Sequence, residues 1–194
     1  MIISEKHNFV YIAVPKTGST SIELALRQLD DKTLLHYGKN EQALEAEDDN
    51  IYKHIGAVDL KKEVNKYYKY FRFGFVRNPW ERVVSCVREE GLHLRSGFLN
   101  KGNFETYPNY FWKQSSDFLY DGDKCLVDFI GKVENMQEDF NTICDNIGIP
   151  QLELPHKNKS KHKHYSEYYD DESIELVAKA YKKDIALFGY KFGD

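Results

Sequence analysis

Three short hydrophobic segments along the chain have the pattern of buried β-strands. Residues 9–14 form an apolar run, residues 71–76 alternate aromatic positions with small or polar ones, and residues 126–133 form a third apolar segment. Each run is too short for an independent helix and is rich in β-branched or aromatic residues, which is typical of strands in a protein interior. We therefore predict three core strands over these ranges.

Helical patterns follow the first two of these segments. Thr20, followed three residues later by Glu23, forms a capping-box pattern and predicts that a helix is capped at Thr20. After the second strand, Asn78 can cap a further helix, and Pro79 suits its first position. Each of these two strands is therefore predicted to lead directly into a helix.

The carboxyl-terminal half of the chain carries two longer helical patterns. One begins near Asn135 and ends at Gly148, a residue type that commonly terminates helices. The other is a single final helix whose apolar positions run from Ile174 to Ile185 at helical spacing. A shorter helix is predicted over residues 58–67.

The alternation of strands and helices predicts the fold class. Such an order favours right-handed crossovers and a parallel sheet that helices cover on both faces. A length of 194 residues fits one domain with a sizeable core. We therefore predict an α/β protein, a single domain over residues 1–194, with three layers built around a central parallel sheet.

Two segments lack a clear strand or helix pattern. Residues 91–124 interleave glycines with aromatic residues and are predicted to form an irregular lobe that faces the substrate. Packing of a loopy subdomain explains most of these aromatic residues individually. Residues 155–165 hold the one concentrated basic run, which is predicted to be a surface loop.

Charge and composition narrow the classes of partner and compartment. A formal net charge of -4 argues against nucleic acid as the main partner, because binding a phosphate backbone usually needs a broad basic face. No stretch reaches the length of a membrane span, and residues 1–7 lack the blocks of a signal peptide, so a cytoplasmic location is expected. The three cysteines are odd in number and widely spaced, which favours reduced thiols over a disulfide frame or a zinc site. No metal site is predicted.

The turn between the first strand and the first helix has the composition of an anion site. The first N–H groups of a helix lack intrahelical partners, and the helix dipole is positive there. Lys16 adds a full charge, Gly18 lets an anion approach the backbone, and hydroxyls come from Thr17, Ser19, Thr20 and Ser21. An ordinary strand-to-helix connection, whose caps are also Ser and Thr, remains the alternative. A strict Walker A loop is excluded because the lysine precedes the glycine.

A second candidate anion site follows the strand over residues 71–76. Arg77 offers a planar fork to a phosphate, and the hydroxyl of Ser85, about two helical turns later, could reach the same anion. Alternatively, Arg77 pairs with an acidic residue and Ser85 packs within its helix.

Together these two motifs resemble those of sulfotransferases that use 3′-phosphoadenosine-5′-phosphosulfate (PAPS). The resemblance rests on residues 15–21 and 75–85, and it extends to residues 132–135, the loop over 154–160 and the closing segment over 181–190. It is strongest to the carbohydrate and glycosaminoglycan branch, in a short bacterial-type form. The resemblance implies a P-loop-like fold and covers nearly the whole chain. We expect neither the membrane anchor nor the paired cysteines of the Golgi members, which argues against a secreted-matrix substrate.

The family resemblance assigns a role to each motif. The 5′-phosphosulfate end of PAPS would lie against the first motif, Lys16, Thr17, Gly18, Ser19, Thr20 and Ser21. The 3′-phosphate would bind Arg77 and Ser85. The basic loop that covers the nucleotide in relatives corresponds to Asn158, Lys159 and Ser160, although a solvated loop explains any one lysine equally well.

The resemblance also implies a general base. Glycosaminoglycan members use a histidine ahead of the second strand, and His54 matches it by position. An unperturbed imidazole has a pKa of about 6.5, which suits proton acceptance at neutral pH. A packed or surface histidine is the alternative at this position. Glu134 or a histidine of the basic run over residues 156–164 would be next in line.

The implied reaction is in-line transfer of the sulfuryl group from PAPS to an acceptor hydroxyl, with 3′-phosphoadenosine-5′-phosphate (PAP) as the product. Lys16 would neutralise charge on the leaving phosphate, and His54 would take the acceptor proton. A carbohydrate acceptor is expected, and the sequence indicates no oligomeric state. Two alternatives stay open: a nucleotide-dependent phosphotransferase, and a non-catalytic nucleotide- or glycan-binding module of the same fold.

Overall fold

The computed structural model describes most of the chain as two compact units. It describes residues 1–29, 34–36, 54, 56–58, 67, 69–89, 113–155 and 163–194. The first unit, here called the sheet unit, comprises Met1–Val76 and Asp117–Lys157, and the second, the helical unit, comprises Arg77–Ser116 and Asn158–Asp194. That residues 1–194 act as a single domain stays a prediction.

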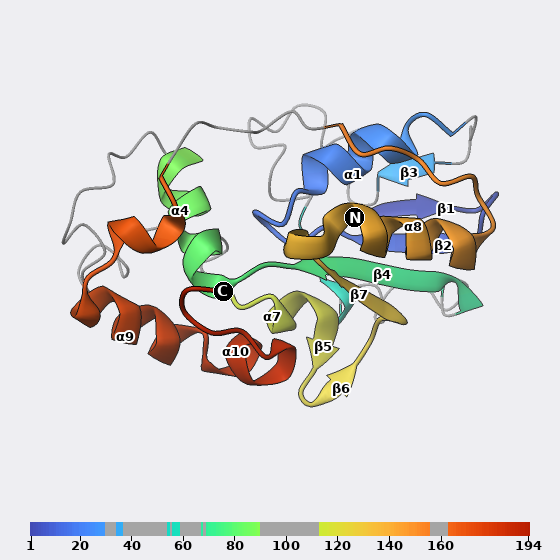
Figure 1. Ribbon diagram of the computed structural model, residues 1–194. Helices are drawn as coiled ribbons and strands as arrows, with labels where there is room; N and C mark the ends of the chain where they lie inside the picture. The colour runs from blue at the N-terminus through green and yellow to red at the C-terminus, as the bar shows by residue number, and fades with distance from the viewer. Residues whose placement is uncertain are drawn as a thin grey trace, which may run out of the picture. The chain divides into compact units, whose positions relative to one another are not determined.

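The sheet unit is built on five strands in the order β3-β1-β2-β4-β7 (Figure 1). Their bounds are Ile2–Ser4 (β1), Phe9–Ile12 (β2), Leu34–His36 (β3), Phe71–Val76 (β4) and Phe129–Lys132 (β7). The three predicted core strands, β2, β4 and β7, are parallel neighbours, as expected. The sheet as a whole is mixed, because β1 pairs antiparallel with both β2 and β3 at its edge.

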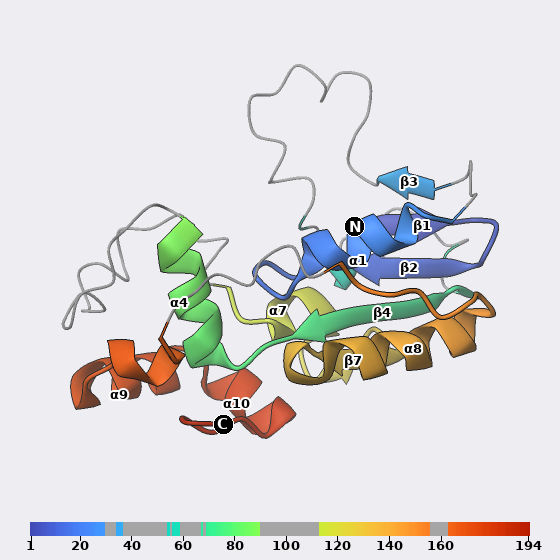
Figure 2. The same cartoon turned by 45° about the horizontal axis from the view of Figure 1, so that its top comes forward.

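Helices lie on both faces of this mixed sheet. On one face, α1 (Ser19–Leu26) and α8 (Met136–Ile147) share a core with inward-facing aromatic residues of β2 and β4, among them Phe9, Tyr11, Phe73 and Phe75. Figure 2 shows α8 running along β4 and β7. On the other face, a Cβ built on Gly74 would meet the side chain of Leu119 from α7 (Ser116–Leu119) at 2.7 Å. The predicted α/β layering of a sheet between helices is confirmed.

Short elements complete the sheet unit. Residues Tyr120–Asp121 (β5) and Lys124–Cys125 (β6) form a two-stranded hairpin, and a single 3₁₀ turn, Val133–Asn135, joins β7 to α8. Gly148 ends α8 with a φ of 70°, as its sequence position indicates. Of the predicted lobe over residues 91–124, only the part from residue 113 lies within the described chain. The predicted helix over 58–67 lies mostly outside it.

The helical unit contains α4 (Pro79–Glu89), a 3₁₀ turn (Tyr165–Tyr168), α9 (Asp171–Ala180) and α10 (Lys182–Phe188). The predicted cap of α4 is confirmed, because Asn78 Oδ1 accepts a hydrogen bond of 3.1 Å from the Trp80 N–H. The prediction of a single final helix was wrong. The chain leaves helical geometry at Tyr181, with φ −109° and ψ 27°, and begins a second helix there. Because the apolar spacing continues through Tyr181, the pattern could not indicate the break.

An ion pair between Arg72 of β4 and Asp128, the residue directly before β7, makes the stability of the fold depend on pH. Arg72 Nε and NH2 donate to Asp128 Oδ2 and Oδ1 at 3.0 and 2.8 Å, and the Arg72 N–H donates to Oδ2 at 2.8 Å. Partial burial raises the pKa of Asp128, but the hydrogen bonds and charge of Arg72 outweigh it, so the pKa is lowered overall. A carboxylate with a lowered pKa stabilises the fold above its unfolded pKa and loses that effect as the pH falls through its folded value.

We therefore expect Asp128→Asn to reduce the free energy of unfolding at pH 7 by about 1 kcal/mol, a small effect because the pair is partly exposed to solvent. The difference from wild type should shrink as the pH falls below about 4, where an unperturbed aspartate becomes protonated. Urea unfolding of both proteins across this pH range measures the difference in their free energies of unfolding. Asp123→Asn in the exposed hairpin turn is the control. A difference that stays constant with pH would contradict the assignment.

Candidate active site

The turn between β2 and α1, residues 13–18, takes its shape from two residues with left-handed backbone. Lys16 has φ 64°, and Gly18 has φ 74° and is the N-cap residue of α1. The predicted capping box at Thr20 was wrong, because the helix begins at Ser19, one residue before Thr20. Glu23 instead accepts from Arg27 at 2.6 Å, one turn further along α1. We call residues 15–21 the anion loop.

The start of α1 carries no group that competes with a bound anion. Its N-cap residue, Gly18, makes no side-chain cap, and the first turn holds no acidic residue. The first N–H groups of such a helix need an acceptor from outside the helix, and the dipole adds positive potential there. The geometry therefore fits a phosphate or sulfate group.

The four hydroxyls of the anion loop differ in their surroundings. Thr17 is fully buried and its Oγ1 donates to Val14 O at 3.0 Å, while Ser21 Oγ donates to Pro155 O at 3.0 Å. A hydroxyl has one proton to donate, so both of these are already used within the protein. Ser19 is largely buried and Thr20 is exposed, and these two hydroxyls are the better candidates for contact with an anion.

The first residue of α8 lies against the anion loop. A Cβ built on Gly18 would come within 2.5 Å of Met136 Cε, so the glycine allows the Met136 side chain to approach the backbone. The side chain of Met136 is partly buried against the same core as α1. No pattern in the sequence indicates this contact, because Met136 follows β7 and is part of α8, whereas Gly18 follows β2 and precedes α1.

His54 contacts the chain directly ahead of the anion loop. Its Nδ1 lies 2.6 Å from Ala13 O, three residues before Lys16. A carbonyl oxygen can only accept, so Nδ1 carries the proton in this contact and the neutral ring keeps its basic lone pair on Nε2. The side chain is partly buried. The structure thus places His54 against Ala13, two residues before the anion loop, and the neutral tautomer has its basic lone pair on Nε2.

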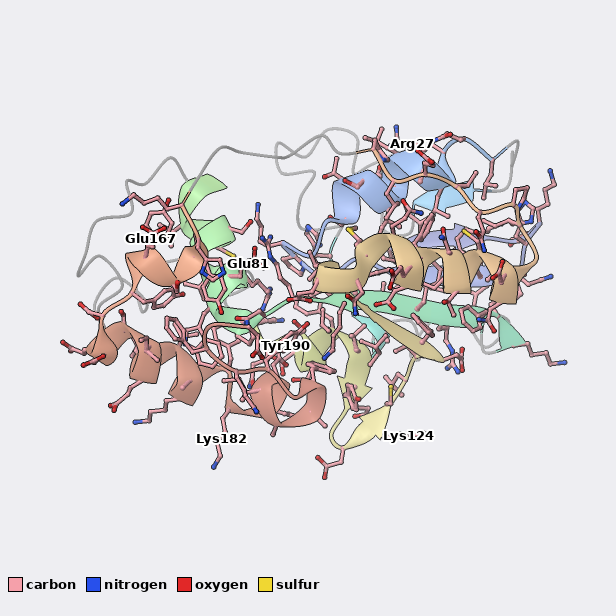
Figure 3. The ribbon with its side chains drawn as sticks, in the orientation of Figure 1. Arg27, Glu81, Lys124, Glu167, Lys182 and Tyr190 are labelled. Carbon is pink, nitrogen blue, oxygen red and sulfur yellow. The ribbon has the colours of Figure 1, made fainter. Side chains whose placement is uncertain are left out.

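In the helical unit, Arg77 has an acidic partner. Its NH2 lies 2.8 Å from Oε1 of Glu81, on the first turn of α4 (Figure 3), and its side chain is only 17% exposed. This is the pairing that remained open as an alternative for Arg77. Ser85 lies partly buried on α4, one further turn beyond Glu81. Asn158, Lys159 and Ser160 lie outside the described residues.

Comparison with known proteins identifies the family. The model of the Sulfotransferase family matches residues 1–101 and 95–191. The chain belongs to this sulfotransferase family. Human carbohydrate sulfotransferase 9 is 26% identical over 94% of this chain, and carbohydrate sulfotransferase 10 of Xenopus laevis is 22% identical over 98%. The chain spans 47% of the length of the human relative and 67% of the Xenopus one.

A solved sulfotransferase from Alicyclobacillus acidocaldarius matches 95% of this chain and 96% of its own, at 14% identity and a TM-score of 0.43. Within the described part of this sulfotransferase, no three His, Cys, Asp or Glu side chains gather as a metal site would require. None of the described helices has the length and apolar character needed to cross a membrane.

Proposed function

We propose that this sulfotransferase transfers the sulfuryl group of PAPS to a hydroxyl group of a carbohydrate. The observation that carries the proposal is the contact between His54 Nδ1 and Ala13 O, which places a candidate base against the residue that follows β2, two residues before the anion loop. Family membership supplies the reaction class, and relatives named carbohydrate sulfotransferases favour the acceptor. A cytoplasmic location stays a prediction from the sequence.

The residues of the anion loop would hold the 5′-phosphosulfate end of PAPS. The N–H groups at the start of α1 would bind anionic oxygens, and Lys16 would offset the charge that develops on the leaving phosphate. In the transfer, the acceptor oxygen forms a bond to sulfur while the bond from sulfur to the bridging phosphate oxygen breaks, which releases PAP. The acceptor proton would pass to His54 Nε2.

The residues of the helical unit would recognise the 3′-phosphate. Arg77 presents a planar guanidinium that suits two phosphate oxygens, and Ser85 supplies a hydroxyl. The contact between Arg77 and Glu81 would then have to rearrange, or the guanidinium would have to contact both groups at once. Asn158, Lys159 and Ser160 would contribute from the basic loop.

The proposal is tested by measuring binding and transfer separately. Calorimetry with PAP should show one site per chain, and incubation with ³⁵S-labelled PAPS should label at least one pool of desulfated glycosaminoglycan or simple glycoside. Absence of PAP binding would refute the proposed function. PAP binding without transfer to any carbohydrate, lipid or phenol acceptor would indicate a nucleotide-binding module in its place.

A further inference from the structure

The side chain of Asn78 ties the start of α4 to two other segments of the helical unit. Its Oδ1 accepts hydrogen bonds from the N–H groups of Trp80 and Glu81 at 3.1 and 3.5 Å, which caps the helix. Its Nδ2 donates to Lys191 O at 3.0 Å and to the Tyr165 hydroxyl at 3.3 Å. Asn78 is only 1% exposed, so these contacts satisfy a buried amide.

The Tyr165 hydroxyl is the centre of the same network. Besides its contact with Asn78, it donates to Asp194 O at 3.3 Å and accepts from the Gly193 N–H at 2.7 Å. The Tyr165 ring is buried and meets the ring of Phe192 edge-on, with 5.8 Å between the centroids. Hydrogen bonds and ring packing therefore hold this part of the chain against one buried tyrosine. We call the hydrogen bonds of Asn78 and Tyr165 the cap network.

The cap network lies directly beside the candidate ligands of the 3′-phosphate. Arg77 is the residue before Asn78, and its NH2 contacts the carboxylate of Glu81, whose N–H belongs to the network. Ser85 lies one turn beyond Glu81 on the helix that Asn78 caps. Burial is the main cause of the raised pKa of Tyr165, and the negative charge of Glu81 adds to it, so the hydroxyl lies within the field of that carboxylate.

This arrangement fixes the Arg77 side chain at both ends before a nucleotide binds. An arginine side chain has several rotatable bonds, and ordering them during binding lowers affinity. Here the cap network fixes the backbone beside Arg77, and Glu81 holds the guanidinium group. A guanidinium has five N–H donors, enough to contact a carboxylate and a phosphate together. Loss of the network would therefore weaken binding of a phosphate at Arg77.

We infer that Asn78 and Tyr165 are positioning residues for the 3′-phosphate, which act through Arg77 and do not touch the nucleotide. The inference rests on the proposed function, in which Arg77 binds that phosphate. It predicts that the cap network contributes to affinity only for nucleotides that carry a 3′-phosphate.

Tyr165→Phe tests this prediction, because it removes the hydrogen bonds of the hydroxyl and keeps the ring. It should raise the Kd for PAP about 5- to 10-fold, a loss of the size of one hydrogen bond. Adenosine 5′-phosphate (AMP) differs from PAP only in lacking the 3′-phosphate, and its Kd should stay within about twofold. Calorimetry measures the Kd for PAP, and competition against PAP measures that for AMP. KM for PAPS should rise while kcat stays within about twofold.

Tyr168→Phe is the matched control. Tyr168 lies in the same 3₁₀ turn as Tyr165, and its hydroxyl makes no hydrogen bond to the part of the chain that the structure describes. Neither Kd should change in this variant. Asn78→Ser provides a second test, because serine keeps a capping oxygen but removes the amide donor to Tyr165. It should reproduce the selective loss of PAP affinity.

A double-mutant cycle with Arg77→Ala shows whether the effect runs through Arg77, because residues that act through one group have coupled effects. Arg77→Ala should raise the Kd for PAP at least as much as Tyr165→Phe and leave the Kd for AMP within about twofold. Adding Tyr165→Phe to Arg77→Ala should then change the Kd for PAP less than about twofold. Multiplicative effects of the two substitutions would overturn the inference.

Two further results would contradict the inference alone. One is an equal loss of affinity for PAP and AMP in Tyr165→Phe and Asn78→Ser, which would indicate a general effect on the fold. The other is a Kd for PAP that neither substitution changes, in a wild-type protein that binds PAP. A wild-type protein that binds neither nucleotide would instead refute the proposed function, and the inference with it.

Discussion

Lys16→Ala should lower kcat/KM for PAPS by about 10²- to 10³-fold, the usual loss when one group that stabilises transition-state charge is removed. Lys16 lies in the turn after β2, which ends at Ile12, within the loop that Gly18 closes at the start of α1. As the bond from sulfur to the bridging oxygen breaks, negative charge grows on the departing phosphate. An ammonium group near this oxygen would stabilise the transition state more than the bound ground state, so kcat should fall more than affinity for PAP.

Because Lys16 has a left-handed backbone, the effect of its charge can be separated from the effect of its backbone conformation. Lys16→Gly also removes the ammonium group, but glycine adopts a φ of 64° without strain. We expect Lys16→Gly to be as slow as Lys16→Ala and to melt at the same temperature as wild type or higher. Wild-type rates in Lys16→Gly would instead show that the lysine matters only for the shape of the loop. Lys124→Ala, on the exposed β5–β6 hairpin (Figure 3), is the charge-matched control.

The central strands and their order were predictable because their sequence signals are local. β2, β4 and β7 are short apolar runs, and each is followed by a turn or a helix start. β1 and β3 were missed because each has three residues and a periodicity cannot be established over so short a length. Their pairing is a tertiary property, since β1 joins the sheet through the hairpin with β2.

The start of α1 shows where local patterns mislead. Thr20 and Glu23 fit a capping box, but Gly18 takes the capping position because its positive φ turns the chain earlier. The positive φ values of Lys16 and Gly18, which shape this turn, were not indicated by the sequence pattern. The pattern also could not predict which hydroxyls are used by the protein itself, because the partner of Ser21, Pro155, lies 134 residues away.

Contacts between distant segments account for the other features that the sequence left open. Met136 against Gly18, and Gln137 against residues 152–154, depend on how α8 packs beside α1. Arg77 had two interpretations, phosphate binding or pairing with an acidic residue. The contact with Glu81 could be anticipated from their spacing of four residues, although helical spacing alone does not choose between the two.

His54→Ala should lower kcat by about 10²- to 10⁴-fold, the contribution typical of a general base, while the Kd for PAP stays within about twofold. The Ala13 carbonyl holds the proton on Nδ1, which places the basic lone pair on Nε2. Without a base, the acceptor hydroxyl must lose its proton to water during the transfer. The acid limb of the pH profile of kcat/KM, which protonation of the imidazole would cause, should therefore disappear in this variant.

His54→Asn distinguishes a base from a structural tether. The asparagine amide can still donate to Ala13 O, where Nδ1 does so in wild type, but it cannot accept a proton at neutral pH. If His54 is the base, His54→Asn should be as slow as His54→Ala, whereas His7→Ala should behave like wild type. Recovery of the wild-type rate in His54→Asn would show that the histidine serves only to hold the backbone at Ala13 through this hydrogen bond. A larger loss of kcat in His164→Ala than in His54→Ala would indicate that a histidine of the basic run is the base.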